Sequence, residues 1–171
     1  SIVLEKKDDE IEDSVRTITL NPFSKNLLDE IGVENDYSMI SEMEVKDFDG
    51  TGKIVFKSSE IGMDHLAFVS DFATLLRSVR KKASEKILYK EEIIKIDNKG
   101  DFHEVTLSSG KIIKTNLIIS SEGKNSKLAN KIPESDKDYF QTALTFLASA
   151  DKDMDTSAFQ IFSDNGICAF M

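Results

Sequence analysis

Cysteine is nearly absent from this sequence of 171 residues, since Cys168 is the only one. A single thiol excludes an internal disulfide and fits a reducing compartment. The apolar residues around Cys168 in GICAFM favour a small core side chain over a nucleophile. The two histidines, His65 and His103, stand far apart without ligand spacing around them, so no metal site is expected.

Long hydrophobic runs are also missing. No segment approaches the length of a transmembrane helix, and nothing resembles a signal peptide. Two prolines and eight glycines are too few to mark a flexible linker. The net charge of -9 argues against a surface for nucleic acid or for anionic membranes. Hydrophobic residues make up 40% of the chain, which is enough for the core of one large domain or two small ones.

Two kinds of candidate strand occur along the chain. Short apolar runs followed by an acid, at 2–4 before Glu5 and at 117–119 before Glu122, indicate buried parallel strands. Segments of alternating polarity joined by tight turns indicate antiparallel pairing. These are a hairpin in 43–57 around DGTG, a meander over 87–89, 93–97, 102–107 and 111–115, and a sheet from 139–150, 157–162 and 166–171. The mixture predicts a parallel α/β layer that carries antiparallel sheets.

Two helices are expected between the strands. Apolar residues recur at helical spacing from Phe23 to Ile31, and Gly32 is expected to end that helix. A second helix is expected over 71–83, with Ser70 as its N-cap. Its apolar face would consist of Phe72, Leu75, Leu76 and Val79.

Four segments resemble the FAD-dependent hydroxylases of ubiquinone biosynthesis, which belong to the para-hydroxybenzoate hydroxylase superfamily of single-component flavin monooxygenases. The segments are LEK at the end of the first strand, RTITLNPFSKNLLDEIGV, LIISSEGKNSKL, and the stretch DYFQTALTFLASADKDMDTSAFQIFSDNGICAFM. The resemblance implies an α/β (α+β mixed) fold. It would combine an incomplete Rossmann-like FAD-binding layer and its β-meander with part of an antiparallel-sheet substrate domain.

The resemblance assigns cofactor roles to Glu5 and Arg16. In a dinucleotide-binding fold, an acid at the end of the second strand accepts hydrogen bonds from the adenosine ribose. Glu5 would be that acid, and the alternative is an ordinary solvated acid at a strand end. Arg16 matches the family arginine near the flavin pyrophosphate, where a planar guanidinium suits phosphate oxygens. Its alternative role is a loop arginine paired with Asp8, Asp9 or Asp13.

Glu122 and Gly123 stand where the family has an Asp-Gly pair near the flavin and the nicotinamide cofactor. The glycine would let the backbone come close to the cofactor, and the alternative is a simple turn after a buried strand. Glutamate is longer than the family's aspartate, and Ala129 stands where the family usually has arginine. Both departures bear on the nicotinamide contact.

Three further positions bear on the cofactor. The segment HLAFVSDF resembles a family segment whose polar side chain reaches the flavin, but here that position falls near Val69 and Ser70. Ser126 fits the serine of the family motif, or it caps a short helix. His65 is interpreted as a surface or strand-end histidine rather than a base.

The glycine-rich turn of a dinucleotide fold lies about 20 residues before the ribose acid, and no GxGxxG occurs in this chain. We therefore expect the chain to be an internal piece of a larger flavoenzyme and, taken alone, to be inactive and without cofactor. Residues 1–38 and 64–135 would form part of the FAD-binding domain. Residues 39–63 and 136–171 would form part of the substrate-binding sheet.

The resemblance implies an FAD- and NAD(P)H-dependent monooxygenase that hydroxylates a polyprenylated phenol through a flavin C4a-hydroperoxide. No catalytic side chain is assigned. The parent protein would be cytoplasmic, in contact with the bacterial inner membrane, and a candidate member of a ubiquinone-biosynthesis complex. One alternative is a related flavin monooxygenase or reductase with another substrate. The other is a scaffold subunit with a flavoprotein fold and no catalysis of its own.

Overall fold

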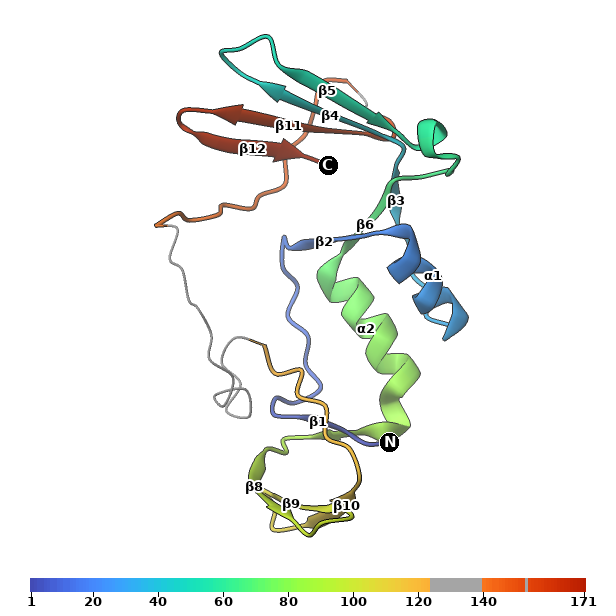
Figure 1. Ribbon diagram of the computed structural model, residues 1–171, viewed down its shortest axis with the longest axis vertical. Helices are drawn as coiled ribbons and strands as arrows, with labels where there is room; N and C mark the ends of the chain where they lie inside the picture. The colour runs from blue at the N-terminus through green and yellow to red at the C-terminus, as the bar shows by residue number, and fades with distance from the viewer. Residues whose placement is uncertain (124–139, 153) are drawn as a thin grey trace. The chain divides into compact units, whose positions relative to one another are not determined.

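The computed structural model describes residues 1–123, 140–152 and 154–171 (Figure 1). The chain forms two compact units, and each is described by itself. The first contains Ser1–Glu10 and Glu85–Leu144, and the second contains Ile11–Ser84 and Thr145–Met171. Parallel and antiparallel strands occur together with α-helices, so the mixed α/β fold class predicted from the sequence is confirmed.

The first unit begins with a parallel strand pair. Strand β1 (Val3–Glu5) lies beside β7 (Ile87–Tyr89), which follows the 3-10 turn η2 (Ser84–Lys86). The parallel direction predicted for the opening strand is therefore correct, but its burial is not. Ile2 and Val3 are 52% and 47% exposed, because β7 is the only strand paired with β1 among the described residues.

A three-stranded antiparallel sheet completes the strands described in this unit. It has the order β10-β9-β8, from β8 (Ile93–Asn98), β9 (His103–Leu107) and β10 (Ile112–Thr115). Its turns contain Gly100 and Gly110, whose positive φ angles of 91° and 85° favour glycine. The core contains Val105 and Leu107, which are 3% and 1% exposed. The meander is thus confirmed for three of its four expected strands, and the segment 87–89 pairs with β1 instead.

Two expected strands are wrong. Residues 117–119 form no strand, and Leu117 and Ile119 are 72% and 77% exposed, since no neighbouring strand in the described ranges pairs with them. Residues 140–150 likewise form no strand, and Tyr139 lies outside the described residues. An apolar run specifies a strand only if another strand supplies its hydrogen-bond partners.

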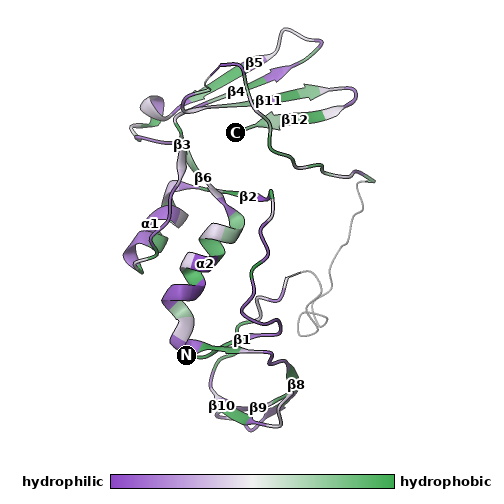
Figure 2. Ribbon diagram, turned by 180° about the vertical axis from the view of Figure 1, so that it is seen from behind, coloured by the Kyte–Doolittle hydropathy of each residue, from purple (hydrophilic) through white to green (hydrophobic). Residues whose placement is uncertain are grey.

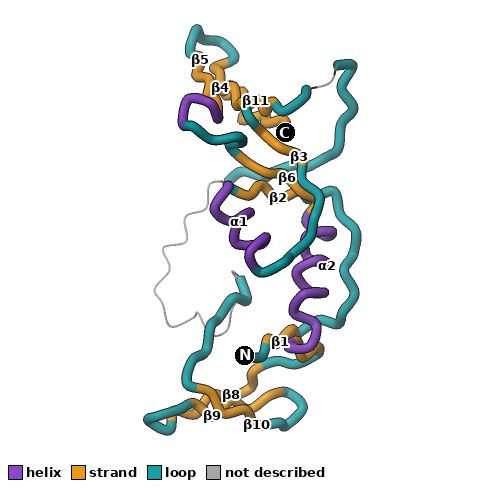
Figure 3. Tube along the Cα trace, turned by 90° about the vertical axis from the view of Figure 1, so that its right-hand side faces the viewer, coloured by secondary structure: helices purple, strands orange, loops and turns teal. Residues whose placement is uncertain are grey.

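The second unit contains a small antiparallel sheet with two helices. The sheet has the order β2-β6-β3, from β2 (Thr17–Leu20), β3 (Ser38–Ile40) and β6 (Ala67–Asp71). Helices α1 (Pro22–Glu30) and α2 (Phe72–Ala83) lie on the same side of it in both views (Figures 1 and 3). The alternation of hydrophobic and hydrophilic residues along α2 is visible in Figure 2, and Ala73 and Leu75 are its buried residues.

Local residues fix the ends of both helices. Asn21 caps α1 by accepting a hydrogen bond from the Ser24 N–H at 2.8 Å. The helix ends at Glu30, and the predicted stop residue Gly32 follows the C-cap Ile31 with a φ of 71°. There the Val33 N–H donates to the Leu28 carbonyl at 2.9 Å. The N-cap of α2 is Asp71 and not Ser70. Ser70 is buried and its hydroxyl bonds to Asn35, whereas Asp71, the last residue of β6, directly precedes the helix and turns its carboxylate onto the Thr74 N–H.

A four-stranded sheet carries the C-terminal part of the unit. Its order is β12-β11-β4-β5, from β4 (Glu42–Asp47), β5 (Lys53–Lys57), β11 (Ser157–Ser163) and β12 (Gly166–Phe170). The two hairpins are antiparallel as predicted, but β11 pairs in parallel with β4. The 3-10 turn η1 (Ser58–Ile61) leads from β5 toward β6. Cys168 is exposed rather than in the core, because β12 is an edge strand.

Candidate functional site

Arg16 and Phe72 meet where two antiparallel strands end. Arg16 precedes β2 and Phe72 follows β6, and the register pairs Thr17 with Asp71. The Phe72 N–H therefore donates to the Arg16 carbonyl at 3.0 Å. The guanidinium carbon of Arg16 lies 4.3 Å from the centroid of the Phe72 ring. This cation–π contact favours side-chain conformations that keep the guanidinium over the ring.

The charge of Arg16 is not neutralised within its own unit. Among the described residues of that unit, no carboxylate forms an ion pair with Arg16. Asp13, one of its expected alternative partners, pairs with Arg77 instead. The donor edge of the exposed guanidinium thus remains available to an anion, and the planar group suits phosphate oxygens.

The N-cap residue of α2, Asp71, brings a negative charge to the start of that helix. The Asp71 carboxylate accepts a hydrogen bond from the Thr74 N–H at 2.7 Å. Hydrogen bonding from Thr74, followed by the more distant charge of Arg77, lowers the pKa of Asp71 below its ordinary value. Asp71 therefore occupies the N-terminus of α2 in its charged form.

Glu5 lies in the other unit, at the end of the parallel strand β1. In register it pairs with Tyr89 of β7. Its side-chain oxygen accepts a hydrogen bond from the Lys7 N–H at 2.9 Å, and the Glu91 N–H donates to its carbonyl at 3.1 Å. This acid is half-buried at the carboxyl end of a parallel strand, which is where ribose hydroxyls are recognised in dinucleotide folds.

Glu122 and Gly123 lie at the end of a described range. Both residues are exposed, and Gly123 has a φ of 76°. A Cβ atom at Gly123 would meet no atom within 4 Å, so the glycine is favoured by its backbone conformation and not by crowding. Ser126 and Ala129, which belong to the same sequence motif, lie outside the described residues.

Val69 and Ser70 face the interior of the second unit. Val69 is 9% exposed and belongs to a core cluster with Ile40, Ala67 and Ala158. Ser70 is 5% exposed, and its hydroxyl accepts a hydrogen bond from the Asn35 amide at 2.7 Å. Neither side chain presents a polar group at the surface, so the polar contact expected in this family segment is not made by Val69.

His65 is held as a strand-end residue. Its Nδ1 lies 3.0 Å from the Ser41 hydroxyl, and its ring packs edge-on against Phe68 with centroids 5.5 Å apart. In residues 1–123, 140–152 and 154–171, no group of three or more His, Cys, Asp or Glu side chains is placed to hold a metal ion. None of the helices in these ranges is long and apolar enough to cross a bilayer.

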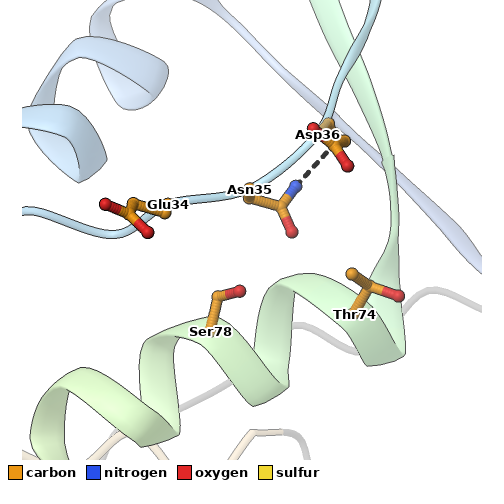
Figure 4. A pocket seen from close by; sticks show the side chains of 5 residues that line it. All are labelled: Glu34, Asn35, Asp36, Thr74 and Ser78. Atoms are coloured by element: carbon orange, nitrogen blue, oxygen red, sulfur yellow. Dashed lines mark hydrogen bonds between the residues drawn. The ribbon is translucent and has the colours of Figure 1, made fainter.

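A polar hollow lies between α2 and the loop that follows α1 (Figure 4). It measures about 250 Å³ and is lined by Glu34, Asn35, Asp36, Thr74 and Ser78. The Asn35 amide closes one side by donating to the Asp36 carbonyl at 2.7 Å. The hollow contains no cationic side chain and none of the residues predicted to bind cofactor, so its chemistry does not suit a phosphate or an apolar ring.

Successive residues of a strand point to opposite sides of a sheet, and over β4 and β5 this gives the four-stranded sheet two chemically different faces. Over β11 and β12 both faces are largely apolar. One face, called here the apolar sheet face, presents Met43, Val45, Ile54, Phe56, Phe162 and Ile167. The opposite face carries ion pairs across β4 and β5. Lys53 and Lys57 lie 2.7 Å and 3.3 Å from Glu44 and Glu42. Hydrogen bonds from Lys53 and Lys46 lower the pKa of Glu44.

The apolar sheet face turns toward the β2-β6-β3 sheet. Ala158, on that face, is 1% exposed and packs with Ile40, Ala67 and Val69. Met171, which continues the same alternation past β12, places its sulfur 3.5 Å from the Thr19 hydroxyl of β2. Ile54, Phe56, Phe162 and Ile167 nevertheless remain 58%, 49%, 41% and 62% exposed. This much exposed apolar surface on one side of a sheet is typical of a binding surface.

Sequence reasoning found Arg16 but missed Phe72 and the apolar sheet face. Phe72 has an ordinary place in the apolar pattern of α2, and only the strand register brings it to Arg16. The apolar sheet face combines alternate residues of four strands. Apolar residues at every second position of each hairpin were a usable signal for that part of the face. No local sequence signal predicts that β4 pairs in parallel with β11.

No protein-family model matches the sequence. Several solved structures share its fold. p-Nitrophenol 4-monooxygenase PnpA from Pseudomonas putida DLL-E4 matches with a TM-score of 0.58 at 15% identity, over 77% of this chain and 36% of that one. CtdE in complex with FAD and substrate 4 has a TM-score of 0.58 at 16% identity, over 77% and 34%. The tetracycline destructase Tet(55) has a TM-score of 0.56 at 12% identity, over 98% and 45%.

These similarities establish the fold class. The chain has the mixed α/β architecture found in part of flavin-dependent monooxygenase structures. It spans between 34% and 45% of the length of the three proteins named.

Proposed function

We propose that this chain belongs to an FAD-dependent monooxygenase that hydroxylates the ring of a lipophilic phenol, with NAD(P)H as the reductant. The observation that carries the proposal is the flavin-monooxygenase fold combined with the apolar sheet face, which packs on the core of the unit that also contains Arg16. Two of the similar proteins are named for this chemistry or were crystallised with this cofactor, namely PnpA and CtdE.

The side chains present fit the cofactor chemically. Arg16 has a planar guanidinium that lies over Phe72 and has no ion-pair partner among the described residues of its unit, and it would hold the pyrophosphate. Glu5, at the end of a parallel strand, would accept hydrogen bonds from the ribose. Gly123, and with it Glu122, would allow close backbone approach to the flavin and the nicotinamide.

Bound FAD would supply the redox chemistry and the activation of oxygen. The protein would bind the ring, orient it and exclude water. The apolar sheet face suits that task, because Phe56, Phe162 and Ile167 are exposed on it and carry no charge. Residues 39–63 and 136–171 would then belong to the substrate domain, and 1–38 and 64–135 to the cofactor domain.

The substrate that we propose is a polyprenylated phenol on the route to ubiquinone. Such a molecule resides in the membrane, so the protein would act from the cytoplasm at the bacterial inner membrane, within reach of other ubiquinone-biosynthesis enzymes. The motif segments LEK, RTITLNPFSKNLLDEIGV and LIISSEGKNSKL support this choice.

The experiment uses the natural gene product. It is expected to purify yellow with bound FAD and to oxidise NAD(P)H faster when a lipophilic phenol is added. Mass spectrometry should detect the phenol with one added oxygen, and a deletion strain should accumulate an unhydroxylated quinone precursor. Absence of flavin, even after reconstitution with FAD, would refute the proposal.

A second candidate function is a scaffold subunit that keeps the flavoprotein fold without catalysis. The burial of Val69, where a polar flavin contact is expected, favours this candidate. A colourless gene product that co-purifies with ubiquinone-biosynthesis enzymes would support it. A third reading, a flavin monooxygenase or reductase for another substrate, predicts bound FAD and no quinone precursor in the deletion strain.

A further inference from the structure

Gln160 is a single amide within the apolar sheet face. On this face it is flanked by Val45 of β4 and Ala169 of β12, which are its register partners. Along β11, the residues before and after it on the same face are Ala158 and Phe162. All four neighbours are apolar, so none of their side chains offers Gln160 a hydrogen bond.

Gln160 is half-buried. In the part of the chain that the structure describes, its side chain makes no hydrogen bond. The other polar side chain on this face, Asp47, follows Val45 on it at the end of β4 and lies opposite Phe162. A glutamine amide contains two N–H donors and one oxygen acceptor. Covering this face with a purely apolar molecule would leave those groups unsatisfied, which is unfavourable.

The chemistry of the face therefore selects a ligand that is apolar over most of its surface and has one hydrogen-bonding group. A ring hydroxyl meets this requirement, since it can donate to the amide oxygen and accept from the amide nitrogen. A charged ligand does not, because the neighbouring side chains on this face would desolvate its charge without compensating it.

We propose that Gln160 is the specificity-determining residue that hydrogen-bonds the hydroxyl of a phenolic substrate lying on the apolar sheet face. This inference rests on the proposed function, which it deepens by assigning one residue to the recognition of the phenol. Gln160 acts in binding and takes no part in the redox chemistry.

The test compares two probes that differ only in the hydroxyl, 4-butylphenol and butylbenzene. Isothermal titration calorimetry on the natural gene product is expected to show 4-butylphenol binding roughly tenfold tighter than butylbenzene, the usual effect of one hydrogen bond. In Gln160→Leu the ratio of the two affinities should fall to about one, because 4-butylphenol loses its hydrogen-bond partner while butylbenzene keeps or gains affinity. Methionine has nearly the same shape as glutamine, so Gln160→Met should give the same ratio as Gln160→Leu. It replaces the leucine variant in the test if that variant does not fold.

The matched control is Lys46→Leu, a polar-to-leucine change on the opposite face of the same sheet. It should leave the ratio unchanged. A ratio that survives in both Gln160 variants, or a natural protein that binds neither probe, would overturn the assignment of Gln160. Binding that depends on Gln160 in a protein without FAD would uphold the assignment while refuting the proposed monooxygenase.

Discussion

Arg16 lies with its guanidinium carbon 4.3 Å above the ring of Phe72, and the Phe72 N–H donates to the Arg16 carbonyl at 3.0 Å. The same two residues thus contact each other through both backbone and side chain. The arrangement favours side-chain conformations of Arg16 that keep its cation over Phe72, at the end of β6. Pre-organisation of this kind lowers the entropy lost when an anion binds.

Replacing Arg16 by alanine should weaken FAD binding about 10- to 100-fold, because hydrogen bonds to a charged group typically contribute about 1.5–3 kcal/mol. Arg16→Lys should recover only part of the affinity, since a lysine cannot form the paired, planar contact. The measurement is the quenching of flavin fluorescence during titration of the deflavinated gene product. Arg77→Ala, which removes the arginine paired with Asp13, is the control and should bind FAD normally. Equal losses in both variants would contradict the role of Arg16.

Asp71→Ala should lower the melting temperature by a few degrees, because α2 loses its N-cap hydrogen bond to the Thr74 N–H. The pKa of Asp71 is lowered in the folded protein, so its contribution is complete above the ordinary aspartate value of 3.8 and is lost as the pH falls through the lower folded value. Thermal melts at neutral pH and below pH 3.8 measure this. The difference between natural protein and variant should shrink in acid. Ser70→Ala should not reproduce the pattern, since Ser70 does not cap the helix.

Gly32→Ala should destabilise the second unit by about 1 kcal/mol or more, because alanine is strained at a positive φ. The φ of Gly32 is 71°, and an added Cβ would lie 2.9 Å from the Lys82 ammonium nitrogen, which must move. Urea unfolding followed by circular dichroism measures the loss. Gly52→Ala is the control, since its nearest neighbour would be an ordinary contact at 3.7 Å with Asp47. Equal stability of the two variants would contradict the positive φ of Gly32 at the end of α1.

Leu107→Ala should cost about 2–5 kcal/mol, the usual effect of truncating a buried leucine. Leu107 is 1% exposed in the β10-β9-β8 sheet, whereas Ile94 in the adjacent strand is 64% exposed. Ile94→Ala should therefore cost about 1 kcal/mol or less. Hydrogen exchange of amides in residues 93–115 measures the difference. Comparable loss of protection in the two variants would contradict the assigned core.

The sequence-based predictions that succeeded depend on local signals. The DGTG turn identified the hairpin of β4 and β5, the apolar period identified α2, and Gly32 marked the end of α1. Each of these signals acts within a few residues. The local conformational preference of the chain was therefore enough to predict the element.

The predictions that failed depend on distant partners. The segment 87–89 is too short to show any period, and β1, its partner, lies at the start of the chain. Leu117 to Ile119 has the composition of a buried strand but has no paired strand among the described residues. Cys168 has apolar neighbours in sequence, yet the position of β12 at the edge of its sheet exposes it.

The candidate site divides in the same manner. Arg16 and Glu5 could be proposed from residue type and motif, because a guanidinium and a strand-end acid have characteristic ligands. Phe72 and Gln160 could not, since their significance comes from the strands that pair around them. Neither residue type indicates a binding role by itself, and the role follows only from the register of the paired strands.

The parallel contact of β4 with β11 has a consequence during synthesis. While residues after Asp47 are still being translated, β4 and β5 can form their hairpin, but β4 keeps an open edge until Ser157–Ser163 leave the ribosome. Until then, nascent chains would expose Val45 and Met43 beside unpaired backbone groups, a state prone to aggregation. Dependence of expression on chaperones would be the biological cost of pairing β4 with a strand that is synthesised so much later.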